Sequence, residues 1–159
     1  MDRAWFGPPC LDQGNEGIVQ SPSSRNHDLL VRLYDAARHS DWATILPMWD
    51  DNVVLHEMPG LPYGGTFEGI ASAGEVMANL GAGLDMSTLV VEYILADEER
   101  AVAMIRVGLH GGLGEIRVSE HWKFRNGKAV EVRPFYWDPE AVTEAVASTK
   151  LRETTERGR

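Results

Sequence analysis

Apolar residues recur at helical spacing in the first half of the chain, which predicts three helices there. An amphipathic helix is expected over residues 27–40, with an apolar stripe formed by Leu29, Leu30, Leu33, Tyr34 and Ala37. Asp41 is a preferred N-cap, so a second, short helix should follow it. The buried stripe of that helix would be Trp42, Ile45, Leu46 and Trp49. A third helix is expected over residues 70–80, before the glycines at 81 and 83.

Strand patterns dominate the second half, where apolar and polar residues alternate. A first strand is already expected at residues 52–58, ended by Pro59-Gly60 and a turn-rich segment at 61–65. Four further strands are predicted at 87–96, 100–110, 115–126 and 128–138. The dipeptide Asn126-Gly127 is a hairpin signal between the last two.

The order of these elements favours an α+β fold with an antiparallel sheet, because helices and strands are largely segregated along the chain. Asp138-Pro139-Glu140 should open a last helix that runs to about Leu151. We therefore expect one domain over residues 26–152, a flexible leader over 1–25 and a frayed tail over 153–159. The chain of 159 residues is long enough for one hydrophobic core.

Composition narrows the class of partner. Fifteen Lys and Arg against 24 Asp and Glu give a formal charge of −9, which disfavours nucleic acid and anionic membranes as partners. Cys10 is the only cysteine, so an intramolecular disulfide is excluded, and no spacing of His, Asp or Glu is typical of a metal site. We expect a cytoplasmic protein without a cofactor.

Strand parity identifies Glu120 as a candidate site residue. It shares a face with Ile116, Val118, Trp122 and Phe124 and is the one polar residue among them. An isolated buried carboxylate must find a partner or stay protonated, because burying the ion costs several kcal/mol. Glu120 is therefore either a structural hydrogen-bonding group or an acid of the site.

Two further carboxylates end strands with apolar companions. Glu57 shares a face with Val53 and Leu55, and it is either a base of the site or a solvated rim group. Asp138 follows Tyr136 on the face that continues from Glu120, and it is either a second candidate base or only a helix cap. Carboxyl groups with different pKa values in one cavity would supply an acid and a base.

The histidines are expected to have lesser roles. His56 and His121 fall on polar faces and are predicted to lie at the surface or in a dimer interface, and His110 remains a minor candidate.

Several short segments resemble the nuclear transport factor 2-like superfamily, and within it the group of SnoaL-like polyketide cyclases and ketosteroid isomerases. The resemblance covers about residues 27–140 and is carried by Ser40-Asp41-Trp42, by residues 48–53 (MWDDNV), 65–69 (GTFEG) and 120–128 (EHWKFRNGK). It implies a curved sheet wrapped by N-terminal helices into a cone-shaped α+β barrel around an apolar pocket, usually as a homodimer. Phe135 and Trp137 are candidates for that interface.

The same resemblance implies roles for the candidates. Glu57 matches the isomerase base, and Glu120 matches the protonated acid that donates a hydrogen bond to the substrate oxyanion. The tyrosine of the isomerase oxyanion hole falls on Leu33, with Tyr34 one residue away. In SnoaL-like cyclases a carboxylate late in the sheet acts as acid or base, a position that Asp138 could fill.

These observations lead to a functional hypothesis with one main alternative. We expect a cofactor-independent isomerase, cyclase or dehydratase that acts on a small hydrophobic carbonyl compound through Glu57, Glu120 or Asp138. Its substrate would contact Tyr34, Tyr63, Trp122 and Tyr136. The alternative is a noncatalytic module of the same fold that binds a small molecule or dimerises.

Overall fold

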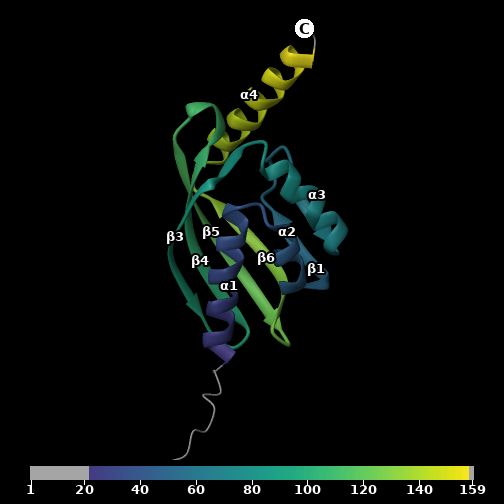
Figure 1. Cartoon of the computed structure of the whole chain (residues 1–159), viewed down its shortest axis with the longest axis vertical. Coiled ribbons are helices and arrows are strands. Elements are labelled where there is room, and N and C mark those ends of the chain that lie inside the picture. The colour runs from purple at the N-terminus through teal and green to yellow at the C-terminus, as the bar shows by residue number, and fades with distance from the viewer. Residues whose placement is uncertain (1–21, 158–159) are drawn as a thin grey trace, which may run out of the picture.

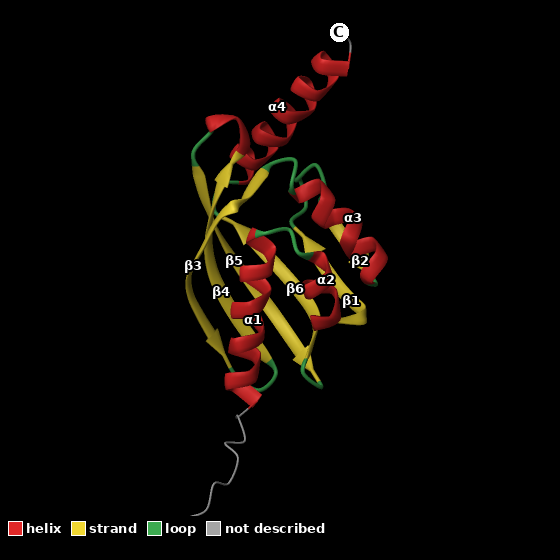
Figure 2. Cartoon of the chain, in the orientation of Figure 1, coloured by secondary structure: helices red, strands yellow, loops and turns green. Residues whose placement is uncertain are grey.

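A curved sheet of six strands, with helices packed against its inner face, forms the computed structural model, which describes residues 22–157 (Figures 1 and 2). The helices are α1 (Pro22–Arg38), α2 (Trp42–Ile45), α3 (Ile70–Leu80) and α4 (Pro139–Arg157). The strands are β1 (Trp49–Glu57), β2 (Gly65–Glu68), β3 (Leu84–Ala96), β4 (Arg100–Leu109), β5 (Glu115–Arg125) and β6 (Lys128–Tyr136). The α+β class expected from the sequence is confirmed.

The sheet has the strand order β2-β1-β6-β5-β4-β3 and does not close into a complete barrel. All neighbouring strands are antiparallel except β1 and β6, which run parallel and pair Leu55 with Val132. The expected hairpin joins β5 to β6, where Asn126 and Gly127 both have positive φ, at 53° and 74°. The sheet therefore brings β1, from the first part of the chain, next to the last strand.

The alternation along β5 and β6 separates an inner, apolar face from an outer, charged face. Ile116, Val118, Trp122 and Phe124 are buried, whereas Arg117, His121, Lys123 and Arg125 are exposed, as their parity predicts. On β6, Val132, Pro134 and Tyr136 are buried on the same inner side. The inner face forms the floor of the hydrophobic core.

Helix α1 is held across the sheet by a buried polar side chain as well as by its apolar stripe. The amide of Asn26, only 4% exposed, donates to the carbonyl oxygens of Asp97 and Glu98 at 2.9 and 3.0 Å. These carbonyls lie in the turn between β3 and β4, and a buried amide without partners would be costly. The anchor fixes α1 along the sheet and thereby places Tyr34.

The second helix is shorter than expected, and one strand is additional. Only Trp42–Ile45 is α-helical; a 3₁₀ turn, Leu46–Met48, follows, and Trp49 already opens β1. Pro47 explains the break, since it has no N–H to donate to the carbonyl four residues earlier. Strand β2 pairs with β1 through Phe67 and Leu55; its four residues are too few to show a period in the sequence.

Both outer helices extend beyond their expected ends. Helix α1 begins at Pro22, so residues 22–25 belong to the folded domain rather than to the leader, and proline suits the first turn of a helix. Helix α4 continues to Arg157, six residues past the expected end, so residues 153–157 are helical rather than frayed. The rest of the expected leader, with Trp5, Phe6 and Cys10, lies outside the described residues.

The end of α3 is tied to the sheet by His110, in the 3₁₀ turn that follows β4. Its backbone N–H donates to the carbonyl oxygen of Gly83 at 3.0 Å, and its Nε2 lies 3.1 Å from the carbonyl oxygen of Gly81. A side chain at Gly83 would collide with Val146 of α4, which explains why glycine stands there. Within residues 22–157, no helix has the length and apolar character needed to cross a membrane.

Asp138 caps α4, and this role can be measured. Its Oδ1 accepts a hydrogen bond from the backbone N–H of Ala141 at 3.0 Å. Replacing Asp138 with alanine should lower the free energy of unfolding by about 1 kcal/mol, because an N–H in the first turn loses its partner. Asp138→Asn should be nearly neutral in the same urea titration, since asparagine caps equally well. Equal losses in both variants would contradict the capping role.

Candidate active site

A cavity of about 70 Å³ lies between the inner face of the sheet and helices α1, α2 and α3. Its floor comes from β1 and β3 to β6, and its roof from the three helices. The lining is apolar except for two carboxyl groups, two tyrosine hydroxyls and the tryptophan indoles. The four oxygen-bearing side chains are Glu57, Glu120, Tyr34 and Tyr136.

Glu120 receives a hydrogen bond from a helix distant in the sequence. The Tyr34 hydroxyl donates to its Oε2 at 2.6 Å, and Trp122 Nε1 donates to the Tyr34 oxygen at 3.0 Å. The indole N–H fixes the direction of this chain, because it can only donate. Burial raises the pKa of Glu120 above its ordinary value, and the hydrogen bond from Tyr34 opposes that rise. Burial therefore shifts Glu120 toward its neutral form.

Glu57, at the end of β1, is only 3% exposed. Tyr136 donates to its Oε2 at 3.0 Å, whereas its Oε1 is buried without a hydrogen-bond partner among the described residues. Burial raises the pKa of Glu57 to about 7; the hydrogen bond from Tyr136 opposes the rise and the negative charge of Glu120 adds to it. At neutral pH Glu57 therefore exists in both protonation states.

The strand register places the two carboxylates in one row across the sheet. Leu55, Val132 and Trp122 are aligned across β1, β6 and β5. Two residues further along β1 and β6, and two residues back along the antiparallel β5, the same alignment gives Glu57, Pro134 and Glu120, with Glu120 directly paired to Pro134. Because β6 lies between β1 and β5, one strand separates the two carboxylates. Neighbouring strands are spaced roughly 4.8 Å apart. A substrate above Pro134 would have one carboxyl group on each side.

Trp122 and Tyr136 line the cavity as expected from the sequence, and so does Tyr34. Tyr63 is buried but is not in the lining. Burial raises the pKa of Tyr63 well above its usual range, and the neighbouring charge of Glu57 adds to the effect. Tyr63 therefore lies behind the site, and the expectation that it contacts substrate directly does not fit this geometry.

Asp138 does not join the other carboxylates. Strand β6 ends at Tyr136, the side chain of Trp137 is 87% exposed, and Asp138 is exposed as well. The chain has left the sheet before Asp138, so its carboxylate faces the first turn of α4 instead of the cavity. The expectation that Asp138 lies on the same face as Glu120 is wrong, because strand alternation holds only as far as Tyr136, where β6 ends.

Trp49 is a lining residue that was expected only as part of a helical stripe. Its ring centroid lies 6.4 Å from that of Trp122, and its side chain is buried. Its Nε1 donor has no hydrogen-bond partner within residues 22–157, which is costly for a buried N–H. Trp49 was misplaced because Pro47 ends the helix in which it was expected. Leu33 lines the cavity too, next to Tyr34.

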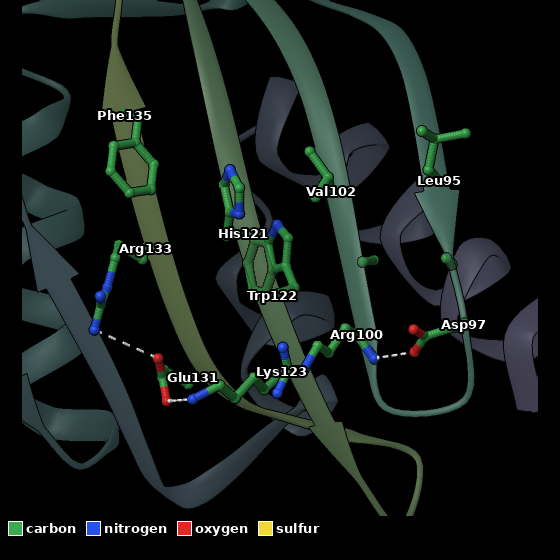
Figure 3. Close-up of a pocket in the computed structure, with 12 residues that line it drawn as sticks. Leu95, Asp97, Arg100, Val102, His121, Trp122, Lys123, Glu131, Arg133 and Phe135 are labelled. Carbon is green, nitrogen blue, oxygen red and sulfur yellow. Dashed lines mark hydrogen bonds and ion pairs between the residues drawn. The ribbon is translucent and has the colours of Figure 1, made fainter.

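A larger hollow of about 670 Å³ lies on the outer face of the sheet, bordered by β3 to β6 (Figure 3). Its charged side chains pair with one another: Glu131 contacts Lys123 at 2.6 Å and Arg133 at 3.7 Å. The hydrogen bond from Lys123 lowers the pKa of Glu131. Because the positive charges of Lys123 and Arg133 stabilise the ionised form of Glu131, this carboxylate is not a candidate acid or base. The outer hollow therefore lacks the pair of carboxyl groups with raised pKa values that the inner cavity contains.

The histidines lie away from the inner cavity. His121 borders the outer hollow, with its ring centroid 5.0 Å from that of the half-exposed Phe135 (Figure 3). His56 Nδ1 is 3.1 Å from the Thr66 hydroxyl. Their expected position on outer faces is therefore confirmed, whereas a role for Phe135 and Trp137 in a homodimer stays a prediction.

Comparisons with known proteins agree with this fold. The model of the SnoaL-like domain family matches residues 30–132. No protein with a curated description matches the chain. The solved structure of Bal32a, from a soil-derived mobile gene cassette, is 19% identical with a TM-score of 0.68, over 78% of this chain and 98% of that one.

Two further similar structures have provisional functional assignments. A protein from Jannaschia sp. CCS1, provisionally a SnoaL-like polyketide cyclase, is 18% identical with a TM-score of 0.66, over 80% of this chain and 96% of that one. A protein from Kribbella flavida DSM 17836, provisionally a ketosteroid isomerase, is 17% identical with a TM-score of 0.59, over 73% and 80%. At these identities the likeness shows the fold alone. Because the family model covers well over half of the chain, this protein belongs to the SnoaL-like domain family, within the nuclear transport factor 2-like fold.

Proposed function

We propose that the protein is a cofactor-independent acid/base enzyme that acts on a small hydrophobic carbonyl compound. The observation that carries this proposal is the pair of carboxyl groups in one apolar cavity, each with a different hydroxyl partner. Two carboxyl groups in unequal environments can serve as base and acid at the same pH. The provisional cyclase and isomerase assignments of similar structures are compatible with this class of reaction.

Glu57 is the proposed base. Its pKa of about 7 provides an ionised fraction at neutral pH and still a strong affinity for a proton, the balance that general base catalysis requires. The unpartnered Oε1 can accept a proton from the carbon next to the substrate carbonyl, while Tyr136 holds Oε2. Breaking that C–H bond transfers its electron pair into the carbonyl, which becomes an enolate.

Glu120 is the proposed acid. In its neutral form it donates a hydrogen bond to the developing enolate oxygen, and the Trp122–Tyr34 chain holds it in place. The proton on Glu57 can then return to another carbon, which completes an isomerisation without any added reactant. Alternatively, the enolate carbon attacks a second carbonyl, whose oxygen takes the proton from Glu57, as in an aldol-type cyclisation. In a dehydration, the enolate instead expels a β-hydroxyl group, which leaves as water with that same proton.

The ionisation of Glu57 should be visible in the stability of the protein. Its pKa is higher in the folded state than the ordinary value of 4.5, so the folded state binds more protons between the two values. The free energy of unfolding should therefore fall by up to about 3 kcal/mol as pH rises from 4.5 to 7. Glu57→Gln should lack this decline. If urea denaturation shows the same pH dependence of the free energy of unfolding for the wild type and for Glu57→Gln, the raised pKa of Glu57 is contradicted.

Turnover can be tested before the natural substrate is identified. Enolisation in D₂O introduces deuterium next to the carbonyl, so a panel of small cyclic ketones can be screened by mass spectrometry. Glu57→Gln and Glu120→Gln should each slow exchange by about 10²-fold or more, because one loses the base and the other the acid. Asp138→Asn is the matched control and should exchange at the wild-type rate.

The noncatalytic alternative gives a different result in that assay. If the wild type binds ketones without accelerating exchange, the protein is a small-molecule-binding module and its carboxylates serve recognition only. Activity that survives in Glu57→Gln would remove Glu57 from the mechanism.

A further inference from the structure

The inner cavity is small, and only one side of it is polar. A volume of about 70 Å³ holds a few water molecules, whereas ligand pockets start at roughly 300 Å³. Its carboxyl groups come from the sheet, on β1 and β5. The parts of its lining that come from α2, α3 and the first residues of β3 carry no ionisable group. A substrate with its carbonyl at the carboxylates would direct its apolar part toward these elements.

A second hollow, of about 210 Å³, lies against that apolar side. Four side chains border both spaces, so a single layer of side chains divides them: Trp42, Met77, Leu80 and Met86. All four are partly exposed. The other residues of the hollow are Ser40, Ala78 and Gly81, so no ionisable side chain from residues 22–157 lines it.

The dividing layer is suited to rearrangement. Methionine has three rotatable side-chain bonds and fills irregular spaces without a fixed shape, so Met77 and Met86 can move at low cost. The rim beyond them is fixed, because His110 contacts the carbonyl oxygen of Gly81 at the end of α3. A flexible partition within a fixed frame would let the two spaces join, and together they approach the volume of ordinary ligand pockets.

We propose that the hollow is the subsite for an apolar tail of the substrate, which passes between Met77 and Met86 while the oxygenated head remains at Glu57 and Glu120. The inference rests on the proposed function for the position of the head. It narrows the substrate class to elongated molecules with one oxygenated end and an unbranched or flat hydrocarbon end. A compact polyhydroxylated compound would not fit, because among the described residues the Ser40 hydroxyl and the Trp42 indole N–H are the only polar side-chain partners that border the hollow, besides backbone groups.

The test uses 4-alkylphenols from phenol to 4-octylphenol as probes, since each has a hydroxyl head and a tail of defined length. The protein is labelled with ¹³C at the methionine methyl groups and observed by NMR; the chain has six methionines. Long-tailed members should shift the signals of Met77 and Met86, whereas phenol should leave both in place. Met104 is the internal control, because it pairs with Ser119 on the outer side of the sheet.

Affinity provides the second readout. The dissociation constant should fall about two- to fourfold per methylene until the hollow is filled, as expected for apolar burial. Equal affinities along the series, shifts that do not depend on tail length, or no binding of any member would each overturn the tail subsite.

Variants separate this proposal from the proposed function. Met77→Ala should widen the partition and lower the dissociation constant of a branched octylphenol relative to the linear isomer, whereas Met104→Ala should leave that ratio unchanged. Circular dichroism checks that both variants fold. If Glu57→Gln keeps its exchange activity while the tail-length effect persists, the proposed function fails and the subsite stands. If deuterium exchange depends on Glu57 but the affinity for 4-alkylphenols does not depend on tail length, the tail subsite is wrong and the proposed function stands.

Discussion

The burial of two carboxyl groups in one apolar cavity is the constraint on which the rest of this site depends. An ionised carboxylate away from water is unstable unless it has partners, and two of them also repel each other. The chain supplies one hydroxyl to each, Tyr34 to Glu120 and Tyr136 to Glu57, and leaves one oxygen of Glu57 without a partner. Because the two groups have different hydroxyl partners and different exposure, one is a candidate acid and the other a candidate base.

The fold supports this arrangement through contacts between distant parts of the chain. The parallel pairing of β1 with β6 brings Glu57 near Tyr136, 79 residues later. Asn26 holds α1 to the turn between β3 and β4, so that Tyr34 reaches Glu120 from above the sheet. Pro134 occupies the position between the carboxylates. These contacts are tertiary, and each depends on the correct register of the sheet.

Alternation in the sequence was sufficient to predict the inner face of the sheet. It identified Glu120 as the polar exception on β5 and placed Trp122 and Tyr136 beside it, because side-chain direction in a strand follows from position alone. It did not predict that Tyr34 would donate to Glu120, since that bond depends on where α1 crosses the sheet. Alternation does not mark where β6 ends, before Asp138, or where β1 begins, at Trp49, so the sequence predicts the wrong surroundings for both residues. Strand β2 has only four residues, too few for an alternation of apolar and polar residues to be recognised in the sequence.

The most direct test of the tuned pair is a ¹³C NMR titration of the side-chain carboxyl groups of Glu57 and Glu120, assigned through the single glutamine variants. The structure predicts that Glu57 titrates at about pH 7 and that Glu120 also titrates above its ordinary value, because both are buried. Titration of both groups near 4.5 would contradict the account, since two solvated carboxylates of ordinary acidity could not act as a base and an acid at neutral pH.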